Sequence, residues 1–429
     1  MVAFTNAAQV AQQPSLPNPL YLEVADRIAN RLCRDAIWDK DRCNWLGWSM
    51  EYAQQRRSAV YQACGSELYG GTSGIALFMA ELVRYTGDKQ QLRCLEGAVN
   101  QAWSMHAKSH PSLRHSFYSG SCGIAFAMIR IGELLQRERL IERGLALMLA
   151  LRDVPIDKKN IDVIGGSAGA IPALLLLAKK YSEASLLDLA CAHGQHLLGL
   201  AEQDAKGASW TTISSPVKAN LTGFAHGTAG IASALLALYQ ATNDQSYLLQ
   251  AEAALQYEKQ WFHESESNWE DLRQTGQTNQ SCSMGWCHGA PGIGLSRLRL
   301  LQMQPLLSDP STISEDLEAA LASTSQALMK PWTPGVNNYS LCHGAGGNAE
   351  LMILAGQHLH RPELSAIAEK VGQEGYDFYV KQGLPWPCGN SGAGESPNLM
   401  LGMAGIGHFY LRLYDSQQVA SVLSIWPED

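Results

Sequence analysis

The stretch that decides the fold is HGTAGIASALLALY, residues 226–239, in which a Gly-x-x-Gly start leads into an apolar run. The same pattern occurs seven times along the chain, with its first glycine at positions 71, 120, 166, 227, 289, 344 and 402. Such recurrence is typical of repeat proteins, whose units bury their apolar faces against their neighbours.

A pair of helices is the predicted repeat unit. Between the glycine motifs lie stretches such as residues 182–203 and 245–263, whose apolar residues recur at helical spacing. No comparable run is expected to alternate with the period of two that marks a strand. Each repeat then has one helix buried on all sides and one half-exposed helix. Seven such pairs predict an all-α fold, a seven-repeat α/α toroid with an inner and an outer ring of helices.

The glycines also predict how the loops are arranged. A glycine at the turn permits a left-handed backbone, and one in the first helical turn lets the neighbouring inner helix approach closely. The shared motif places the N-terminus of every inner helix at the same end of the barrel. The side chains just before each motif are therefore expected to face one central mouth.

Composition and charge restrict the class of protein. Of the 429 residues 46% are hydrophobic and 17% charged, and the net charge of −8 with scattered Lys and Arg argues against nucleic-acid binding. The longest apolar run, residues 170–178, is too short for a membrane span, and no signal-peptide pattern is present. We predict a cytoplasmic protein with a flexible lead-in over residues 1–20 and one domain over residues 21–429.

Five potential metal ligands precede the motifs of the fourth, fifth and sixth repeats, namely His226, Cys287, His288, Cys342 and His343. Thiolates together with imidazole suit Zn²⁺ better than Mg²⁺ or Ca²⁺, which prefer oxygen. If both residues of both Cys-His pairs were ligands, the site would be closed and structural. With three ligands it would keep an open position, as catalytic zinc sites do. The spacing leaves both arrangements open.

Five motifs of the chain occur in a characteristic order: DVIGGSAG (162–169), GFAHGTAG (223–230), GWCHGAPG (285–292), LCHGAGG (341–347) and NLMLGMAGIGHFYLRLYD (398–415). Together they resemble the motifs of the lanthionine synthetase C-like family, and the last one particularly resembles the C-terminal cyclase domain of class II lanthipeptide synthetases. The resemblance covers residues from about 25 to the end of the chain and implies a seven-repeat α/α toroid with peptide cyclase activity.

The resemblance also implies a ligand set. Cys287, Cys342 and His343 would hold one Zn²⁺ per chain, with His288 off the metal and one coordination position open. The implied reaction adds peptide cysteine thiols to dehydroalanine or dehydrobutyrine, which forms lanthionine and methyllanthionine rings.

The acid and base groups follow from the same resemblance, which implies His226 as the acid/base residue and Asp162 as its partner. Taken alone, Asp162 also fits an N-cap of the next helix, and His226 a solvated helix start. Some stand-alone cyclases of the family carry an arginine shortly before the first zinc cysteine. Residues 281–285 read SCSMG here, so the sequence does not indicate an arginine that stabilises an enolate.

The implied partner is a dehydrated precursor peptide, and because the chain leaves no room for a dehydratase, a separate dehydratase polypeptide is expected to supply it. Two other functions fit the motifs: addition of glutathione to dehydroamino acids, and a non-catalytic zinc toroid that binds peptides or partner proteins. A toroidal glycosidase is disfavoured because it needs a pair of carboxylates, whereas the motif loops supply only Asp162.

Overall fold

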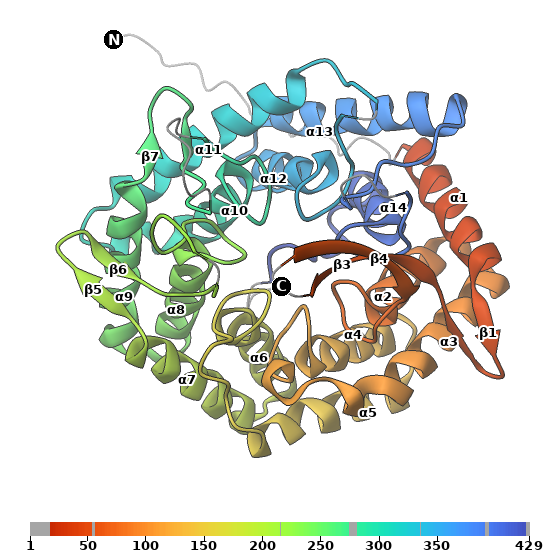
Figure 1. The fold of residues 1–429 in the computed structure, drawn as a ribbon, viewed down its shortest axis with the longest axis horizontal. Helices are drawn as coiled ribbons and strands as arrows, with labels where there is room; N and C mark the ends of the chain where they lie inside the picture. The colour runs from red at the N-terminus through yellow and green to blue at the C-terminus, as the bar shows by residue number, and fades with distance from the viewer. Residues whose placement is uncertain are drawn as a thin grey trace, which may run out of the picture.

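The computed structural model describes residues 18–53, 56–214, 216–273, 281–334, 336–390 and 394–425. Within these residues, fourteen α-helices form two concentric rings, which confirms the predicted toroid (Figure 1). Residues 1–17 of the predicted lead-in lie outside the described residues. Its last two residues, Pro19 and Leu20, already belong to helix α1 (Pro19–Asp35).

The inner ring consists of the seven helices that begin at the glycine motifs. These helices are buried on nearly every side, and in α8 every residue from Thr228 to Tyr239 is buried. Because no face is left to solvent, their sequences are apolar all round. The inner helices are α2 (Thr72–Thr86), α4 (Ser121–Leu134), α6 (Ser167–Tyr181), α8 (Thr228–Thr242), α10 (Ala290–Leu300), α12 (Ala345–His358) and α14 (Met403–Tyr414).

The outer helices each have a buried and a more exposed face, as Val24, Ile28 and Leu32 of α1 illustrate with their buried four-residue spacing. Helix α1 packs on α14, so the N-terminal helix is the outer partner of the last repeat and closes the ring (Figure 1). The other outer helices are α3 (Lys89–Met105), α5 (Glu138–Leu149), α7 (Ala184–Gly199), α9 (Gln245–Lys259), α11 (Ser311–Met329) and α13 (Pro362–Gly375).

In the described part of the chain, four antiparallel hairpins are added to this helical frame. The longest pairs Leu46 with Ala63 and Trp48 with Tyr61. Residues 46–53 alternate apolar and polar side chains, LGWSMEYA, so the expectation of no alternating run was wrong for this segment. The strands are β1 (Ile37–Asp39) with β2 (Arg42–Asn44), β3 (Leu46–Ala53) with β4 (Arg56–Ala63), β5 (Glu202–Asp204) with β6 (Gly207–Ser209), and β7 (Phe262–His263) with β8 (Asn268–Trp269).

The first glycine of the motif is mostly not left-handed, contrary to the prediction. Only Gly289 has a positive φ, of 94°. At the other six motifs φ lies between −106° and −158°, an extended backbone that any residue can adopt. Glycine is needed there because of close approach: a Cβ at Gly166 would lie 1.7 Å from the carbonyl oxygen of Asn160.

The second glycine of the motif makes room for the preceding loop. In all seven repeats, a Cβ at this position would lie between 1.7 and 2.2 Å from the carbonyl oxygen six residues earlier. The loop folds back across the helix start, where Ile161 O accepts a hydrogen bond from Ala168 N at 3.0 Å. The predicted close approach of a neighbouring repeat also occurs, since a Cβ at Gly230 would lie 2.5 Å from Val163 Cγ2.

Gly169→Ala is therefore expected to lower the free energy of unfolding by about 1–3 kcal/mol, because the new methyl group overlaps Val163 O. Gly199→Ala is the matched control, since a Cβ there meets no atom within 4 Å, and it should leave stability unchanged or raise it by about 0.5 kcal/mol. Thermal or urea unfolding followed by circular dichroism measures both. Equal stability of the two variants would contradict the steric explanation.

Backbone hydrogen bonds tie the motif loops to one another around the mouth. In most repeats the N–H of the residue two positions before the first glycine donates to the carbonyl of the equivalent residue in the neighbouring repeat. The exception is the pair of Tyr118 and Ile164, where the Ser116 hydroxyl donates to Ile164 O in place of the Tyr118 N–H. The donor and acceptor pairs are Ile164 and Ala225 (3.4 Å), Ala225 and Cys287 (3.2 Å), Cys287 and Cys342 (3.2 Å), Cys342 and Met400 (3.0 Å), Met400 and Tyr69 (3.0 Å), and Tyr69 and Tyr118 (2.8 Å).

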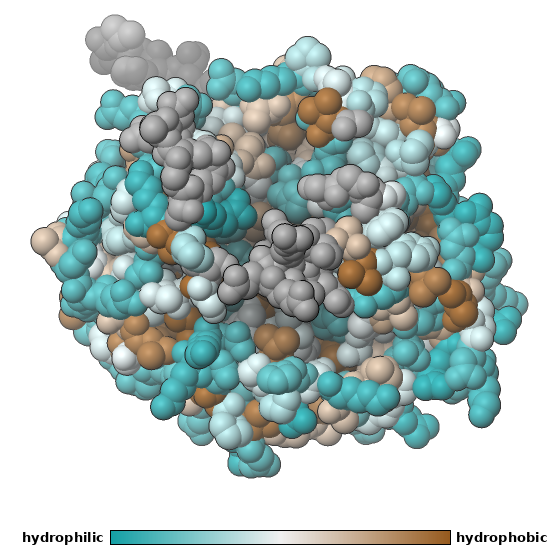
Figure 2. All heavy atoms as spheres, in the orientation of Figure 1, coloured by the Kyte–Doolittle hydropathy of each residue, from teal (hydrophilic) through white to brown (hydrophobic). Residues whose placement is uncertain are grey.

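The last described segment contacts residues that precede two of the inner helices. The buried Tyr118 hydroxyl donates to Val422 O at 2.7 Å, and the buried Trp286 Nε1 donates to Leu423 O at 2.9 Å. On the face shown in Figure 2, hydrophilic residues dominate the rim, and hydrophobic ones are scattered among them. Among the described helices, none combines the length and the apolar character that a membrane span requires.

Candidate active site

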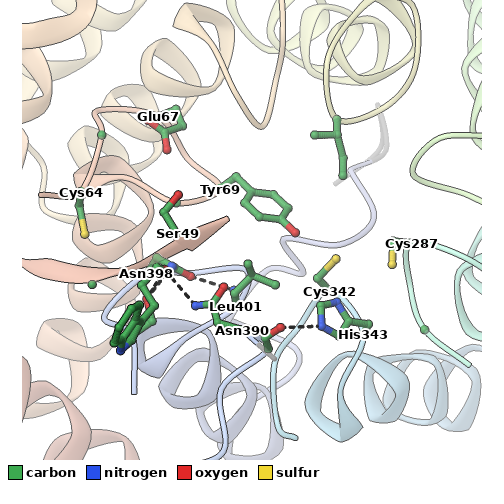
Figure 3. A pocket seen from close by; sticks show the side chains of 18 of the residues that line it. Ser49, Cys64, Glu67, Tyr69, Cys287, Cys342, His343, Asn390, Asn398 and Leu401 are labelled. Carbon is green, nitrogen blue, oxygen red and sulfur yellow. Dashed lines mark hydrogen bonds between the residues drawn. The ribbon is translucent and has the colours of Figure 1, made fainter. Parts of the chain in front are cut away.

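A cavity of about 1000 Å³ lies among the motif loops. One wall carries Cys287, Cys342 and His343, and another is formed by the base of the β3–β4 hairpin with Ser49 and Cys64 (Figure 3). The ring of backbone hydrogen bonds holds the loops in register, so side chains far apart in the sequence meet at this cavity.

Cys287, Cys342 and His343 form a compact group of potential metal ligands. Their ligand atoms all lie within 4.8 Å of one another, and no other group of three or more Cys, His or carboxylate side chains in the described part of the chain has this geometry. Cys342 is buried, Cys287 is half-buried, and His343 is exposed to the cavity. Two sulfurs and one imidazole nitrogen are the donor types that Zn²⁺ prefers.

The orientation of the His343 ring is fixed by a backbone contact. Its Nε2 lies 2.9 Å from Gly389 O, and because a carbonyl accepts hydrogen bonds, Nε2 carries the proton. The lone pair of the neutral ring is then on Nδ1, the nitrogen that remains for the side-chain hydrogen bond between His343 and Cys287. Metal-binding histidines commonly donate their second ring N–H to a carbonyl in this way, which fixes the tautomer of the ring.

The two thiols share a proton. A hydrogen bond with Cys342 lowers the pKa of the Cys287 thiol well below its ordinary value, against the effect of burial. The pKa of Cys342 is raised because it donates that hydrogen bond and is itself buried. The pair therefore favours one thiolate beside one thiol, and a cation at this position would favour two thiolates.

His288 lies outside this group. It is 5% exposed, and its ring stacks on that of His226 with centroids 5.4 Å apart and an interplanar angle of 26°. Burial lowers the pKa of His288 to about 4, so its ring is neutral at physiological pH. Of the two Cys-His pairs, His343 therefore lies with both cysteines, whereas His288 stacks on His226.

Asp162 and His226 form a hydrogen-bonded pair between neighbouring repeats. His226 Nδ1 lies 2.6 Å from Asp162 Oδ2, and Asp162 Oδ1 accepts a hydrogen bond from Gly165 N at 2.6 Å. Asp162 therefore caps its own loop and contacts His226 at the same time. Burial disfavours the charged imidazole, but the hydrogen bond and the charge of Asp162 outweigh it and raise the pKa of His226 above its ordinary value.

Arg273 also lines the cavity. Its Nη2 lies 2.6 Å from Asp271 Oδ2 and its Nε 2.9 Å from Asp271 Oδ1, and Ser283 Oγ lies 3.4 Å from Nη2. The carboxyl of Asp271 is buried, yet the hydrogen bonds from Arg273 and Ser283 hold its pKa well below the ordinary range. A guanidinium group held in this way is a fixed positive charge beside the two cysteines.

Residues 63–425 match the model of a protein family described as lanthionine synthetase C-like protein. This chain belongs to that family. The lacticin 481/lactococcin biosynthesis protein of Lactococcus lactis subsp. lactis is 23% identical over an alignment of 386 residues, and the match covers 85% of this chain and 37% of that protein. The chain thus spans little more than a third of the length of that relative.

The fold of this lanthionine synthetase C-like protein is also similar to a solved structure. Nisin cyclase matches it with a TM-score of 0.64 at 18% sequence identity, and the match covers 93% of this chain and 95% of that chain. At this identity the likeness shows the fold, and it agrees with the toroid that the glycine repeats predict.

Two cavity residues of this lanthionine synthetase C-like protein were missed by the sequence analysis. Arg273 was missed because residues 281–285 were searched, whereas the arginine lies fourteen positions before Cys287. Tyr69 has the same position in its repeat as Cys287 and Cys342, two residues before the first glycine. Aligning the repeats at that position, and not only at the residue next to the glycine, would have found it.

Proposed function

We propose that this protein is a zinc-dependent peptide cyclase that adds cysteine thiols to dehydroalanine or dehydrobutyrine in a dehydrated precursor peptide. The observation that carries the proposal is that the compact group of Cys287, Cys342 and His343 shares one cavity with His226, whose ring is hydrogen-bonded to Asp162. Membership of the lanthionine synthetase C-like family supports the same chemistry.

The residues present fit a zinc ion. Their donor set and spacing suit the metal, and the Gly389 carbonyl orients His343 so that Nδ1 is available. Cys287, Cys342 and His343 would hold it as three protein ligands, with an open position for the substrate. Zinc bound there would keep the substrate thiol as a thiolate, the form that attacks the dehydroamino acid.

His226 would protonate the α-carbon after the sulfur has added to the β-carbon. The Asp162 carboxylate holds the proton on Nδ1, which orients the ring and raises the pKa of His226, so the charged acid persists to higher pH than in a free imidazole. The His288 ring stacks on one face of the His226 ring and further restricts its orientation. Arg273 would stabilise the negative charge that develops on the carbonyl oxygen, in place of the arginine that residues 281–285 lack.

The proposal is tested by incubating the zinc-loaded protein with a dehydrated peptide that contains free cysteines. Addition of a thiol to a dehydroamino acid leaves the peptide mass unchanged but removes thiols, so treatment with an alkylating reagent should afterwards add fewer labels. The reaction without protein gives the background rate. Full labelling after prolonged incubation would contradict cyclase activity, and a mass gain with added glutathione would indicate glutathione addition instead.

Asp162→Asn should narrow the pH range of cyclisation on its alkaline side. The carboxylate raises the pKa of His226, so its loss lowers that pKa, and the protonated imidazole then disappears at a lower pH. Rates measured between pH 5 and 9 in the wild type and the variant check this. An alkaline limb at the same pH in both proteins would contradict the role of the pair.

A further inference from the structure

Tyr69 is a cavity residue whose hydroxyl has no place in the proposed reaction. It belongs to the loop before α2, and its hydroxyl points toward the sulfur of Cys342 (Figure 3). The two side chains are hydrogen-bonded, and because a thiolate sulfur carries no proton, the phenol O–H is the donor to a Cys342 thiolate. This contact joins repeats whose motifs lie about 270 positions apart in the sequence, 69 and 342.

The position of Tyr69 is fixed by backbone hydrogen bonds and by ring packing. Its N–H donates to Tyr118 O at 2.8 Å, and its carbonyl accepts from Met400 N at 3.0 Å. Its ring packs edge-on against Tyr118 with centroids 6.5 Å apart and an interplanar angle of 84°. Because Met400 O in turn accepts from Cys342 N at 3.0 Å, the tyrosine and the cysteine are held by one continuous backbone network. A donor held in this way is already in place for a Cys342 thiolate and needs no reorganisation.

We propose that Tyr69 is a positioning residue of the metal centre, whose hydroxyl donates a hydrogen bond to the Cys342 thiolate and withdraws negative charge from that sulfur. The inference rests on the proposed zinc site. Cys287 and Cys342 place two thiolates on one ion, and a substrate thiolate would be a third. A hydrogen bond to Cys342 offsets the repulsion among them and makes that sulfur a poorer nucleophile, so that the protein's own thiolate does not compete with the substrate for the dehydroamino acid.

Tyr118 provides a matched control. It occupies the same position in the next repeat and is buried, but its hydroxyl donates to Val422 O at 2.7 Å and it does not line the cavity. Tyr118→Phe removes a buried hydrogen bond of similar kind without touching a sulfur. A change that is found in Tyr69→Phe and not in Tyr118→Phe is therefore due to the contact with Cys342.

The experiment compares wild type, Tyr69→Phe and Tyr118→Phe, each with retained helical circular dichroism and each loaded with Co²⁺ in place of zinc. Loss of the hydrogen bond raises the energy of the sulfur lone pairs, so the thiolate-to-cobalt charge-transfer bands of Tyr69→Phe should move to longer wavelength. Its zinc affinity, measured by competition with a chelator, should fall about 10- to 100-fold. Tyr118→Phe should match the wild type in both measurements.

The charge-transfer bands decide the outcome. Bands at the wild-type wavelength in Tyr69→Phe, or the same shift in Tyr118→Phe, would overturn the inference whatever the affinities are. Failure of the wild type itself to bind zinc or cobalt would overturn the proposed metal site as well. The two failures are thus distinguishable.

Discussion

Cys287→Ala, Cys342→Ala and His343→Ala are each expected to lose bound zinc and, with it, all thiol addition above the background rate. Three protein ligands leave no spare donor, so removing one leaves too few for tight binding. Metal analysis of the purified variants after gel filtration measures the zinc content. Helical circular dichroism should be retained, because a core built on seven largely buried inner helices holds the fold without the metal.

His288→Ala is the matched control for these variants, since it removes the histidine of an identical Cys-His-Gly-Ala segment. This variant should keep the wild-type zinc content because its ring stacks on His226 and lies outside the ligand group. If His288→Ala lost zinc as completely as His343→Ala, the site would be a closed four-ligand one, and the proposal of an open coordination position would be wrong.

His226→Ala should slow cyclisation by about 10²- to 10⁴-fold, the usual contribution of a general acid, while its zinc content stays that of the wild type. The ring lies beside the cavity with Asp162 holding its Nδ1, so its loss removes the proton donor and leaves the metal ligands intact. The rate is measured as loss of peptide thiols at near-neutral pH, after subtraction of the reaction without protein.

His110→Ala serves as the control for His226→Ala, because His110 is exposed and contacts only its own turn through Ser112. It should cyclise at the wild-type rate. A rate of zinc-replete His226→Ala within a few-fold of wild type would assign protonation to water and leave His226 as a residue that lines the cavity.

The repeat architecture was predictable from sequence because it depends on local chemistry. Seven Gly-x-x-Gly motifs mark places where a loop folds back on its own helix, and Gly169 shows why no larger residue fits there. The apolar run that follows each motif can be stabilised only by burial on all sides, which requires neighbouring copies of the same unit. The outer helix of the last repeat was not predictable. It is α1, the first helix of the chain, which packs on the last helix, α14, and such a long-range contact has no local sequence pattern.

The site was predictable in part. The sequence placed Asp162, His226, Cys287, Cys342 and His343 in loops that begin inner helices, and a common orientation of those helices brings such loops to one mouth. Tyr69 shares the motif position of Cys287 and Cys342, so the repeats already contain a signal for it, but its contact with Cys342 depends on hydrogen bonds between repeats. Arg273 lies outside every motif, so no local sequence pattern places it beside the cavity.

The two Cys-His-Gly-Ala segments show most directly what only the tertiary structure decided. Their sequences are identical, yet the glycine after His288 has φ 94°, whereas the glycine after His343 has φ −117°. The first backbone turns its histidine onto His226, and the second presents its histidine to Gly389 O and to the cysteines. The sequence by itself determined that two such pairs meet at one mouth. Which histidine joins the cysteines depended on the neighbouring repeats, because a loop takes the backbone conformation that its surroundings stabilise.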